Sequence, residues 1–243
     1  MITIRFYEEL NDLLPRELRK RRFIVSCPAP RSVKDLIESQ GVPHTEVDLI
    51  LVNGESVGFD QVVRDGDDVA VYPVFESFDI GPVSKLPRGP LRRVRFVADV
   101  HLGKLVRRLR LLGFDCLYDT AMDDPELAEV SHRENRVLLT RDKGLLMRSE
   151  VTHGIYIRSD RAMEQLRQVV ERLQLQGEIK PWSRCLACNG LLDKVGRESV
   201  HGDVPEFTYR TMPEFWRCRS CGKVFWPGSH LPKLQRFIDQ VRN

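Results

Sequence analysis

Residues 96–146 read FVADVHLGKLVRRLRLLGFDCLYDTAMDDPELAEVSHRENRVLLTRDKGLL, and this stretch decides the fold of the central part of the chain. Short apolar runs alternate with segments whose apolar residues recur every three or four positions. Strand and helix patterns in alternation favour an open α/β sheet with parallel strands. The sequence predicts these strands over residues 94–98, 114–118 and 137–140.

Acidic residues follow each predicted strand. Asp99 ends the first, Asp123 and Asp124 come after the second, and Asp142 follows the third. Because the carboxyl ends of parallel strands meet at one edge of a sheet, we expect these four candidate catalytic carboxylates to converge there. Carboxylates without His or Cys suit a hard divalent cation, Mg²⁺ or Mn²⁺. An acid before Pro125 is also typical of a helix N-cap, so we expect either Asp123 or Asp124 to cap the next helix.

The helix predicted over residues 102–112 carries a strongly basic face. Residues 84–113 hold nine basic residues and a single acid, which is Asp99. A basic helix face is often only a solvated surface, but its position beside an acidic site favours contacts with phosphate groups. The cations concerned are Lys104, Arg107, Arg108 and Arg110 on the helix, and Arg141 before the last acid. All of them except Arg110 are our candidate phosphate-binding residues.

Four of the six cysteines form two C-x2-C pairs separated by 29 residues. Two such pairs supply four thiolates for a closed, tetrahedral Zn²⁺ site, with a redox pair as the alternative. A site closed by four cysteines has no position for water, so its role is structural, and the segment between the pairs is predicted to be a zinc ribbon. The predicted ligands are Cys185, Cys188, Cys218 and Cys221.

Aromatic and basic residues intermingle near the second cysteine pair, a composition typical of surfaces that stack on unpaired bases. The alternative is that the aromatic side chains pack against a last helix over residues 231–241. We expect His201 and His230 to be packing or surface residues, because four cysteines complete the metal shell. The intermingled residues are Trp216, Phe225, Trp226 and His230, with Arg210, Arg217, Arg219 and Lys223.

Residues 1–80 are predicted to form a separate small α/β domain. Strand patterns at residues 2–6, 23–27, 47–52 and 69–74 surround one helix after Ser32, an order similar to a ubiquitin-like β-grasp fold. Sulfur carriers of this kind end in two glycines, which are absent here, so we favour a docking or stabilising module. Residues 1–80 carry nine Lys and Arg against 15 Asp and Glu, a net charge of −6. These acids serve either solubility or docking on the basic helix.

The chain of 243 residues is 42% hydrophobic and 30% charged, which indicates a globular protein with more than one domain. No apolar run approaches the roughly 18 residues of a membrane span, and we expect a cytoplasmic protein that does not bind membranes. Residues 81–243 carry a net charge of +9, which favours an anionic partner. We place a linker rich in proline and glycine at 81–92, an α/β domain at 93–180, and the ribbon with a C-terminal helix at 181–243.

The segments DVHLGKLVRRLRLLGFD, DDPEL and VLLTRDKGLL resemble the Mut-7 C-terminal RNase domain, a PIN-like nuclease fold with a zinc ribbon. The resemblance covers roughly residues 93–240, and the N-terminal part is similar to the ubiquitin-like domain that often precedes it. It implies a metal-dependent RNase whose acids fall on Asp99, on Asp123 or Asp124, and on Asp142. RNA, structured RNA such as tRNA included, is the implied substrate, and the β-grasp domain offers a site for a protein partner. The alternative function is a non-catalytic RNA-binding or adaptor protein with the same fold.

Overall fold

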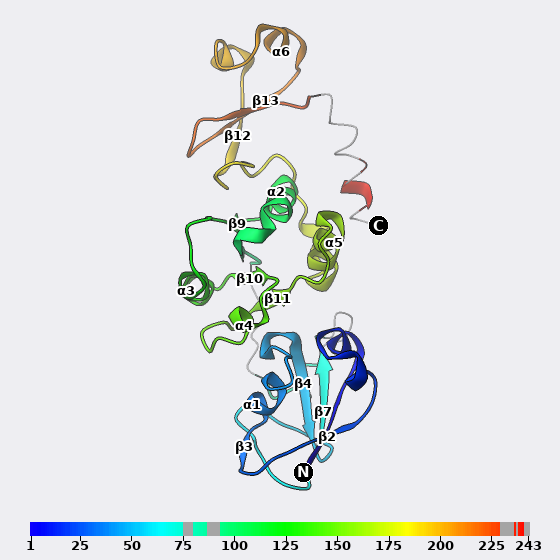
Figure 1. Cartoon of the computed structure of the whole chain (residues 1–243). Helices are drawn as coiled ribbons and strands as arrows, with labels where there is room; N and C mark the ends of the chain where they lie inside the picture. Colours follow the sequence, from blue (N-terminus) through cyan, green and yellow to red (C-terminus); the bar gives the residue numbers. More distant parts are fainter. Residues whose placement is uncertain (75–79, 87–92, 229–235, 237, 241–243) are drawn as a thin grey trace. The chain divides into compact units, whose positions relative to one another are not determined.

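The computed structural model describes residues 1–74, 80–86, 93–228, 236 and 238–240 (Figure 1). By its internal contacts the chain divides into two compact units. One unit contains residues 1–93 and 121–157, and the other contains residues 94–120 and 158–243. His230 and most of the helix predicted over residues 231–241 lie outside the described residues. None of the described helices is long and apolar enough to cross a membrane.

The first unit begins with a five-stranded sheet in the order β2-β1-β7-β4-β5. Strand β1 is parallel to β7, and the remaining neighbours are antiparallel. The two longest strands, β7 and β4, lie side by side in Figure 1. This arrangement confirms the predicted ubiquitin-like fold. The strands are β1 (Ile2–Phe6), β2 (Phe23–Val25), β4 (Val47–Val52), β5 (Glu55–Ser56) and β7 (Asp68–Pro73), and β3 (Arg31–Ser32) pairs with β6 (Val62–Val63) outside this sheet.

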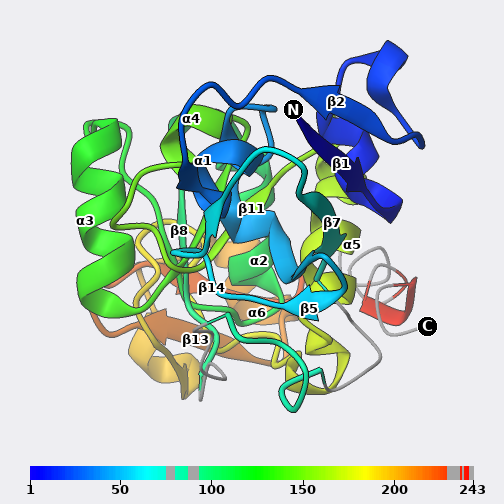
Figure 2. The same ribbon diagram turned by 90° about the horizontal axis from the view of Figure 1, so that it is seen from below.

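Helix α1 (Val33–Glu38) packs against the sheet through Val33, Leu36 and Ile37, which join one buried core with the inward residues of β1 (Figure 2). Ser32 caps the helix, because its hydroxyl accepts a hydrogen bond from the Asp35 amide at 3.0 Å. Leu86 is buried in the same core, so the first half of the predicted linker packs against this domain. Short 3₁₀ helices complete it: η1 (Glu8–Leu13), η2 (Arg16–Leu18) and η3 (His44–Glu46).

The rest of the first unit is the segment of residues 121–157, which contains Asp142. It contains α3 (Asp124–Glu134), β10 (Val137–Thr140), α4 (Lys143–Leu146) and β11 (Gly154–Tyr156). Strand β10 occupies the predicted residues, is buried along its whole length and pairs in parallel with β11. A strand with no exposed face is typical of a parallel sheet covered on both sides.

The ubiquitin-like domain holds this segment through three long-range hydrogen bonds. His44 Nε2 is 2.9 Å from the Val151 carbonyl oxygen, and Lys143 Nζ donates to the Leu13 carbonyl at 2.7 Å. Glu46, only 1% exposed, accepts a hydrogen bond from the Tyr156 amide at 2.8 Å. Its carboxylate therefore supplies the acceptor for a backbone group of β11. The N-terminal domain consequently supports the segment at the start of α4, just before β11 and at the end of β11.

We expect Glu46→Ala to lower the free energy of unfolding by about 1–3 kcal/mol, because it leaves the Tyr156 amide without its acceptor. For a chain of this size the melting temperature should fall by roughly 2–10 °C, and amide exchange over residues 151–157 should accelerate. Glu46→Gln keeps an acceptor oxygen and should have a smaller effect. Glu55→Ala, on the exposed side of β5, is the control. Equal melting temperatures for Glu46→Ala and Glu55→Ala would contradict the role assigned to Glu46.

The second unit starts with two short parallel strands and a basic helix. Gly113, at a φ of +95°, ends the helix segment, and a Cβ there would lie 2.1 Å from the Lys180 carbonyl oxygen, so only glycine fits. The helix that follows in this unit begins at Ala162, with Arg161 in the N-cap position. The elements are β8 (Phe96–Ala98), η4 (Val100–Leu102), α2 (Gly103–Leu111), β9 (Cys116–Leu117), α5 (Ala162–Arg172) and η5 (Leu175–Glu178).

The C-terminal part of this unit is a small antiparallel sheet, visible as the β12–β13 ribbon in Figure 1. Strand β13 lies between β12 and β14. Val200, Val204 and Phe215 form a small buried core beside it. The elements are β12 (Leu192–Val195), η6 (Arg197–Val200), α6 (Glu206–Thr211), β13 (Phe215–Cys218) and β14 (Val224–Phe225).

The acids that give the N-terminal domain its negative charge near β7 are engaged locally. Asp67 accepts hydrogen bonds from Asn53 Nδ2 at 2.8 Å and from the Arg64 amide at 2.7 Å. Asp68 lies 3.4 Å from Arg22, and Asp65 pairs with the amino group of Met1. These contacts stabilise the turn before β7 and agree with the solubility interpretation of the acidic charge.

Candidate functional site

The four predicted zinc ligands come together in the second unit. The Sγ atoms of Cys185, Cys188, Cys218 and Cys221 all lie within 4.8 Å of one another, and the Cys188–Cys218 pair is closest at 3.4 Å. Among the residues that the structure describes, this is the one group of three or more metal-binding side chains. Four thiolates at such separations match the donor set and tetrahedral geometry of structural Zn²⁺.

The two cysteine pairs sit on matching turns. In the first, the Asn189 amide donates to the Cys185 carbonyl at 3.0 Å, and in the second the Gly222 amide donates to the Cys218 carbonyl at the same distance. Asn189 and Gly222 both have positive φ, +67° and +72°. The left-handed residue after each pair turns the chain so that both thiols face one point.

The environment of the thiols differs across the cluster. Burial raises the pKa of Cys185 to about 12. Burial also acts to raise the pKa of Cys218, but hydrogen bonds from the amides of Cys221 and Ser220 outweigh it and lower that pKa to about 7. Amides that stabilise a thiolate are the usual support of a metal-bound sulfur. The residues present therefore fit Zn²⁺.

The first cysteine pair is anchored to the α/β part of the same unit by Arg110. The sequence predicted Arg110 on the exposed face of its helix, and this is wrong: it is 4% exposed. Its guanidinium donates to the carbonyl oxygens of Cys116, Leu186 and Ala187 at 3.0, 3.2 and 2.8 Å. Burial lowers the pKa of Arg110, against the attraction of nearby thiols and Asp115. The helical spacing could have predicted this burial, since Arg110 lies four residues after buried Val106 and is therefore on the same face of the helix.

A second anchor joins the same two parts. Asp115 accepts hydrogen bonds from Asn189 Nδ2 at 2.8 Å and from Arg184 at 2.9 Å, and both partners of the ion pair are largely buried. Asn189 Oδ1 in turn accepts from the Cys116 amide at 3.0 Å. Asn189, which turns the first cysteine pair, is thus also bound to the start of β9, so metal binding and packing of the α/β part are linked.

The candidate catalytic acid Asp142 follows β10 and caps α4. Its Oδ1 accepts hydrogen bonds from the amides of Gly144 at 2.7 Å and Leu145 at 3.4 Å. The carboxylate is exposed, and its second oxygen makes no hydrogen bond to the residues that the structure describes. Capping therefore leaves one oxygen of Asp142 available for a cation.

Asp123 and Asp124 differ in role. Asp123 is the N-cap of α3 and forms a capping box, in which its side chain accepts from the Glu126 amide at 2.9 Å and its own amide donates to the Glu126 carboxylate at 3.1 Å. Asp124 is exposed and makes no such bond. The predicted cap is thus confirmed and assigned to Asp123, which makes Asp124 the freer of the two carboxylates.

Asp99 belongs to the second unit, at the end of β8. It is 9% exposed, and its carbonyl accepts from the Leu102 amide at 3.0 Å at the start of η4. Burial of this degree is unusual for a carboxylate that acts only as surface charge. The position immediately after the strand is the one predicted.

Three of the predicted RNA-binding cations occupy one exposed side of α2. Lys104, Arg107 and Arg108 are three or four residues apart, the spacing that places side chains on one face. Lys104 and Arg107 are exposed, and Arg108 is half-buried and donates to the Lys104 carbonyl at 3.1 Å. Arg141, the fourth, is exposed beside Asp142.

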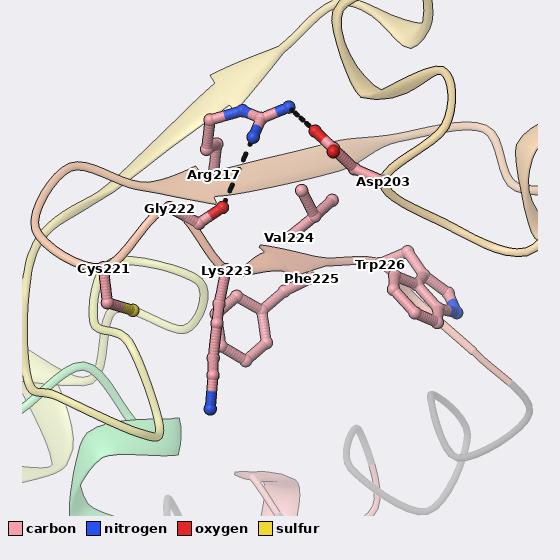
Figure 3. Close-up of a pocket in the computed structure, with 8 residues that line it drawn as sticks. All are labelled: Asp203, Arg217, Cys221, Gly222, Lys223, Val224, Phe225 and Trp226. Carbon is pink, nitrogen blue, oxygen red and sulfur yellow. Dashed lines mark hydrogen bonds and ion pairs between the residues drawn. The ribbon is translucent and has the colours of Figure 1, made fainter.

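Most of the aromatic and basic side chains near the second cysteine pair already contact other side chains of the protein. Trp216 stacks on Trp182 with ring centroids 4.6 Å apart, and Trp226 packs against the small ribbon core. His201 packs edge-on against Tyr209, in agreement with its predicted packing role. Three of the basic side chains form ion pairs: Arg210 with Glu206, Arg217 with Asp203, and Arg219 with Asp193 (Figure 3 shows the Arg217 pair).

Comparison with known protein families accounts for both parts of the chain. The family described as Mut7-C RNAse domain matches residues 94–238, and the one described as Mut7-C ubiquitin matches residues 1–79. No curated protein and no solved structure matches the chain. The first match covers more than half of the residues, and the two follow one another in the predicted order. The chain belongs to the Mut7-C RNAse domain family, with a Mut7-C ubiquitin-like domain at its N-terminal end.

Proposed function

We propose that this protein is a metal-dependent ribonuclease that hydrolyses phosphodiester bonds in RNA. The observation that carries the proposal is the match of residues 94–238 to an RNase domain, within which acids occupy the predicted strand ends and helix starts. Asp99, Asp142 and one of Asp123 and Asp124 would hold Mg²⁺ or Mn²⁺. Asp124 is favoured over Asp123, because the latter is already bound to the start of α3.

The proposed chemistry divides between the cation and the side chains. A divalent cation bound by carboxylates supplies a Lewis acid that activates water and offsets charge on the scissile phosphate. Lys104, Arg107, Arg108 and Arg141 would hold the RNA backbone through its phosphates, which binds without reading the bases. The zinc ribbon would add RNA contacts rather than catalysis, since its four cysteines leave no open metal position.

Partners follow from the same proposal. RNA is the substrate, and structured RNA such as tRNA is one candidate class. A protein partner through the ubiquitin-like domain is also proposed. The surface of that domain around His44 and Glu46 already contacts β11, so such a partner would use another face.

We expect cleavage of a labelled RNA to require Mg²⁺ or Mn²⁺. Protein dialysed free of these ions should cleave at least about 10³-fold more slowly, because the cation contributes several kcal/mol of transition-state stabilisation. Adding either ion should restore the rate. Zinc content is measured in the same samples, so that loss of structural zinc is not mistaken for loss of the catalytic ion.

Two results would contradict the proposal in different ways. Full activity in dialysed, zinc-replete protein would show cleavage without a divalent cation. Tight RNA binding with no cleavage under any metal condition would favour the alternative, a non-catalytic RNA-binding protein.

A further inference from the structure

A groove of about 540 Å³ in the second unit lies between α2 and the zinc ribbon. Its walls come from α2, from the residue after β9, from the first cysteine pair and from the β13–β14 hairpin. Besides buried Arg110, the lining contains two exposed cations, two aromatic rings and two larger apolar side chains: Arg107, Lys223, Tyr118, Phe225, Val106 and Leu186. This composition suits a ligand with both a negative charge and a flat apolar face.

The two exposed cations of the groove form no ion pair with the residues that the structure describes. Arg107 and Lys223 are exposed, and neither forms an ion pair within the described part of the chain. Arg110, at the floor of the groove, is occupied by the carbonyl groups of the first cysteine pair. Of the basic residues near the second cysteine pair, Lys223 is thus the one left to meet an anion. Unpaired cations on two different walls favour a phosphate group between them.

The aromatic rings of the groove are held in place but not covered. The Tyr118 hydroxyl donates to the Val100 carbonyl at 2.8 Å, and a Cβ on Gly103 would lie 2.9 Å from that hydroxyl, so glycine gives the ring room over the first turn of α2. Phe225 is half-buried and lines the groove together with Lys223, whereas Trp226 is not among the lining residues. Figure 3 shows the Lys223 and Phe225 side chains next to one another and Trp226 apart from them. A partly exposed ring beside an uncommitted cation is the pairing that binds one nucleotide, base on ring and phosphate on cation.

We propose that this groove binds an unpaired nucleotide of RNA, with Arg107 and Lys223 on the phosphates and Phe225 and Tyr118 against the base. The inference rests on the proposed function for the identity of the ligand and adds to it a preference for single-stranded segments. A base within a duplex is stacked on its neighbours and cannot reach these rings. The groove thus selects unpaired RNA, while the basic face of α2 accepts any RNA backbone.

The test measures RNA binding rather than cleavage, with full-length Asp142→Asn protein so that the RNA stays intact. The probes are a labelled single-stranded RNA of about 10 nucleotides and the duplex of the same sequence. Phe225→Ala should weaken binding of the single strand about tenfold and leave duplex binding within about twofold. Phe207→Ala is the matched control, because Phe207 is a 75% exposed aromatic residue of α6 outside the groove. Its affinities should not change.

The cations are tested in the same way. Lys223→Met should weaken binding of the single strand and lower the salt dependence of that binding by about 0.7 in log–log slope, as expected for one lost phosphate contact. Lys194→Met is the control, since Lys194 of β12 is already paired with Glu214. Zinc content and melting temperature show whether each variant is folded. If Phe225→Ala loses zinc, Phe225→Leu keeps most of the apolar volume, removes the ring, and should weaken single-strand binding in the same direction.

Equal affinities of Phe225→Ala and Phe207→Ala for the single strand would overturn the proposal, and so would equal losses of single-strand and duplex binding in Phe225→Ala. So would a wild-type groove that binds neither RNA, which is the result expected if its ligand were a protein. The groove and the proposed activity can fail separately. Unchanged single-strand binding by Phe225→Ala refutes the groove even if the protein cleaves RNA. RNA binding through the groove without any cleavage refutes the nuclease.

Discussion

Asp142→Asn and Asp99→Asn proteins are expected to bind RNA but to cleave it at least about 10³-fold more slowly than the wild type. An amide keeps the shape of the side chain and removes the negative charge that holds a divalent cation, whose contribution is several kcal/mol. Cleavage of a labelled RNA in Mg²⁺ or Mn²⁺, measured in single turnover, reports the loss. Both variants cleaving at the wild-type rate would exclude the proposed site.

The structure indicates that Asp142→Asn removes the negative charge without disturbing the start of α4. Asparagine is as good an N-cap as aspartate, so the bonds from the Gly144 and Leu145 amides to Oδ1 should remain. Asp142→Ala, which also removes the cap, should be less stable by about 1 kcal/mol. A comparison of the two separates loss of charge from loss of fold.

The same substitution distinguishes Asp123 from Asp124. Asp123→Asn retains the cap of α3 and should leave most of the activity, whereas Asp124→Asn should reduce cleavage as Asp142→Asn does. The reverse result would give Asp123 both roles, capping through one oxygen and metal binding through the other.

Cys188→Ser is expected to abolish binding of the single Zn²⁺ per chain and to unfold the ribbon. Structural zinc supplies about 10–16 kcal/mol of folding energy to the small module that it closes, and the core of the ribbon contains only a few buried apolar residues. Metal analysis should give one zinc for the wild type and none for the variant. Amide exchange should become fast after about residue 183, while β10 stays protected.

The chain contains its own control for this experiment. Cys27 is a half-buried cysteine of the ubiquitin-like domain, and Cys27→Ser should keep full zinc content. The anchors add a further expectation: because Arg110 and Asn189 join the first cysteine pair to β9, loss of zinc should also loosen Cys116. Wild-type protein purified without chelator and free of zinc would refute the assignment.

Local patterns were sufficient for much of this fold. The buried run 137–140 is a strand with the predicted bounds, and the spacing of the cysteines predicted a cluster that the structure forms. The Asn53-Gly54 turn has φ of +52° and +86°, the left-handed pair that a tight hairpin needs. In each case the determining interactions lie within a few residues, or are set by covalent spacing.

Features that depend on distant residues were not predictable. The spacing from Val106 indicates that Arg110 lies on a buried face, but nothing near Arg110 indicates that carbonyl groups 76 and 77 residues later accept its hydrogen bonds. Among the predicted stacking residues, the choice of Phe225 over Trp216 depends on Trp182, whose partner the sequence does not indicate.

The bonds from the ubiquitin-like domain to the segment around β11 join residues 107, 110 and 130 positions apart. Ribosomes add roughly 5–20 residues per second, so Glu46 is made about 5–20 s before Tyr156. The early domain has its own core and can fold in that interval. In the nascent chain the ubiquitin-like domain is therefore folded first, with the Glu46 carboxylate still exposed to water. Strand β11 is synthesised later and buries this carboxylate when its Tyr156 amide binds it.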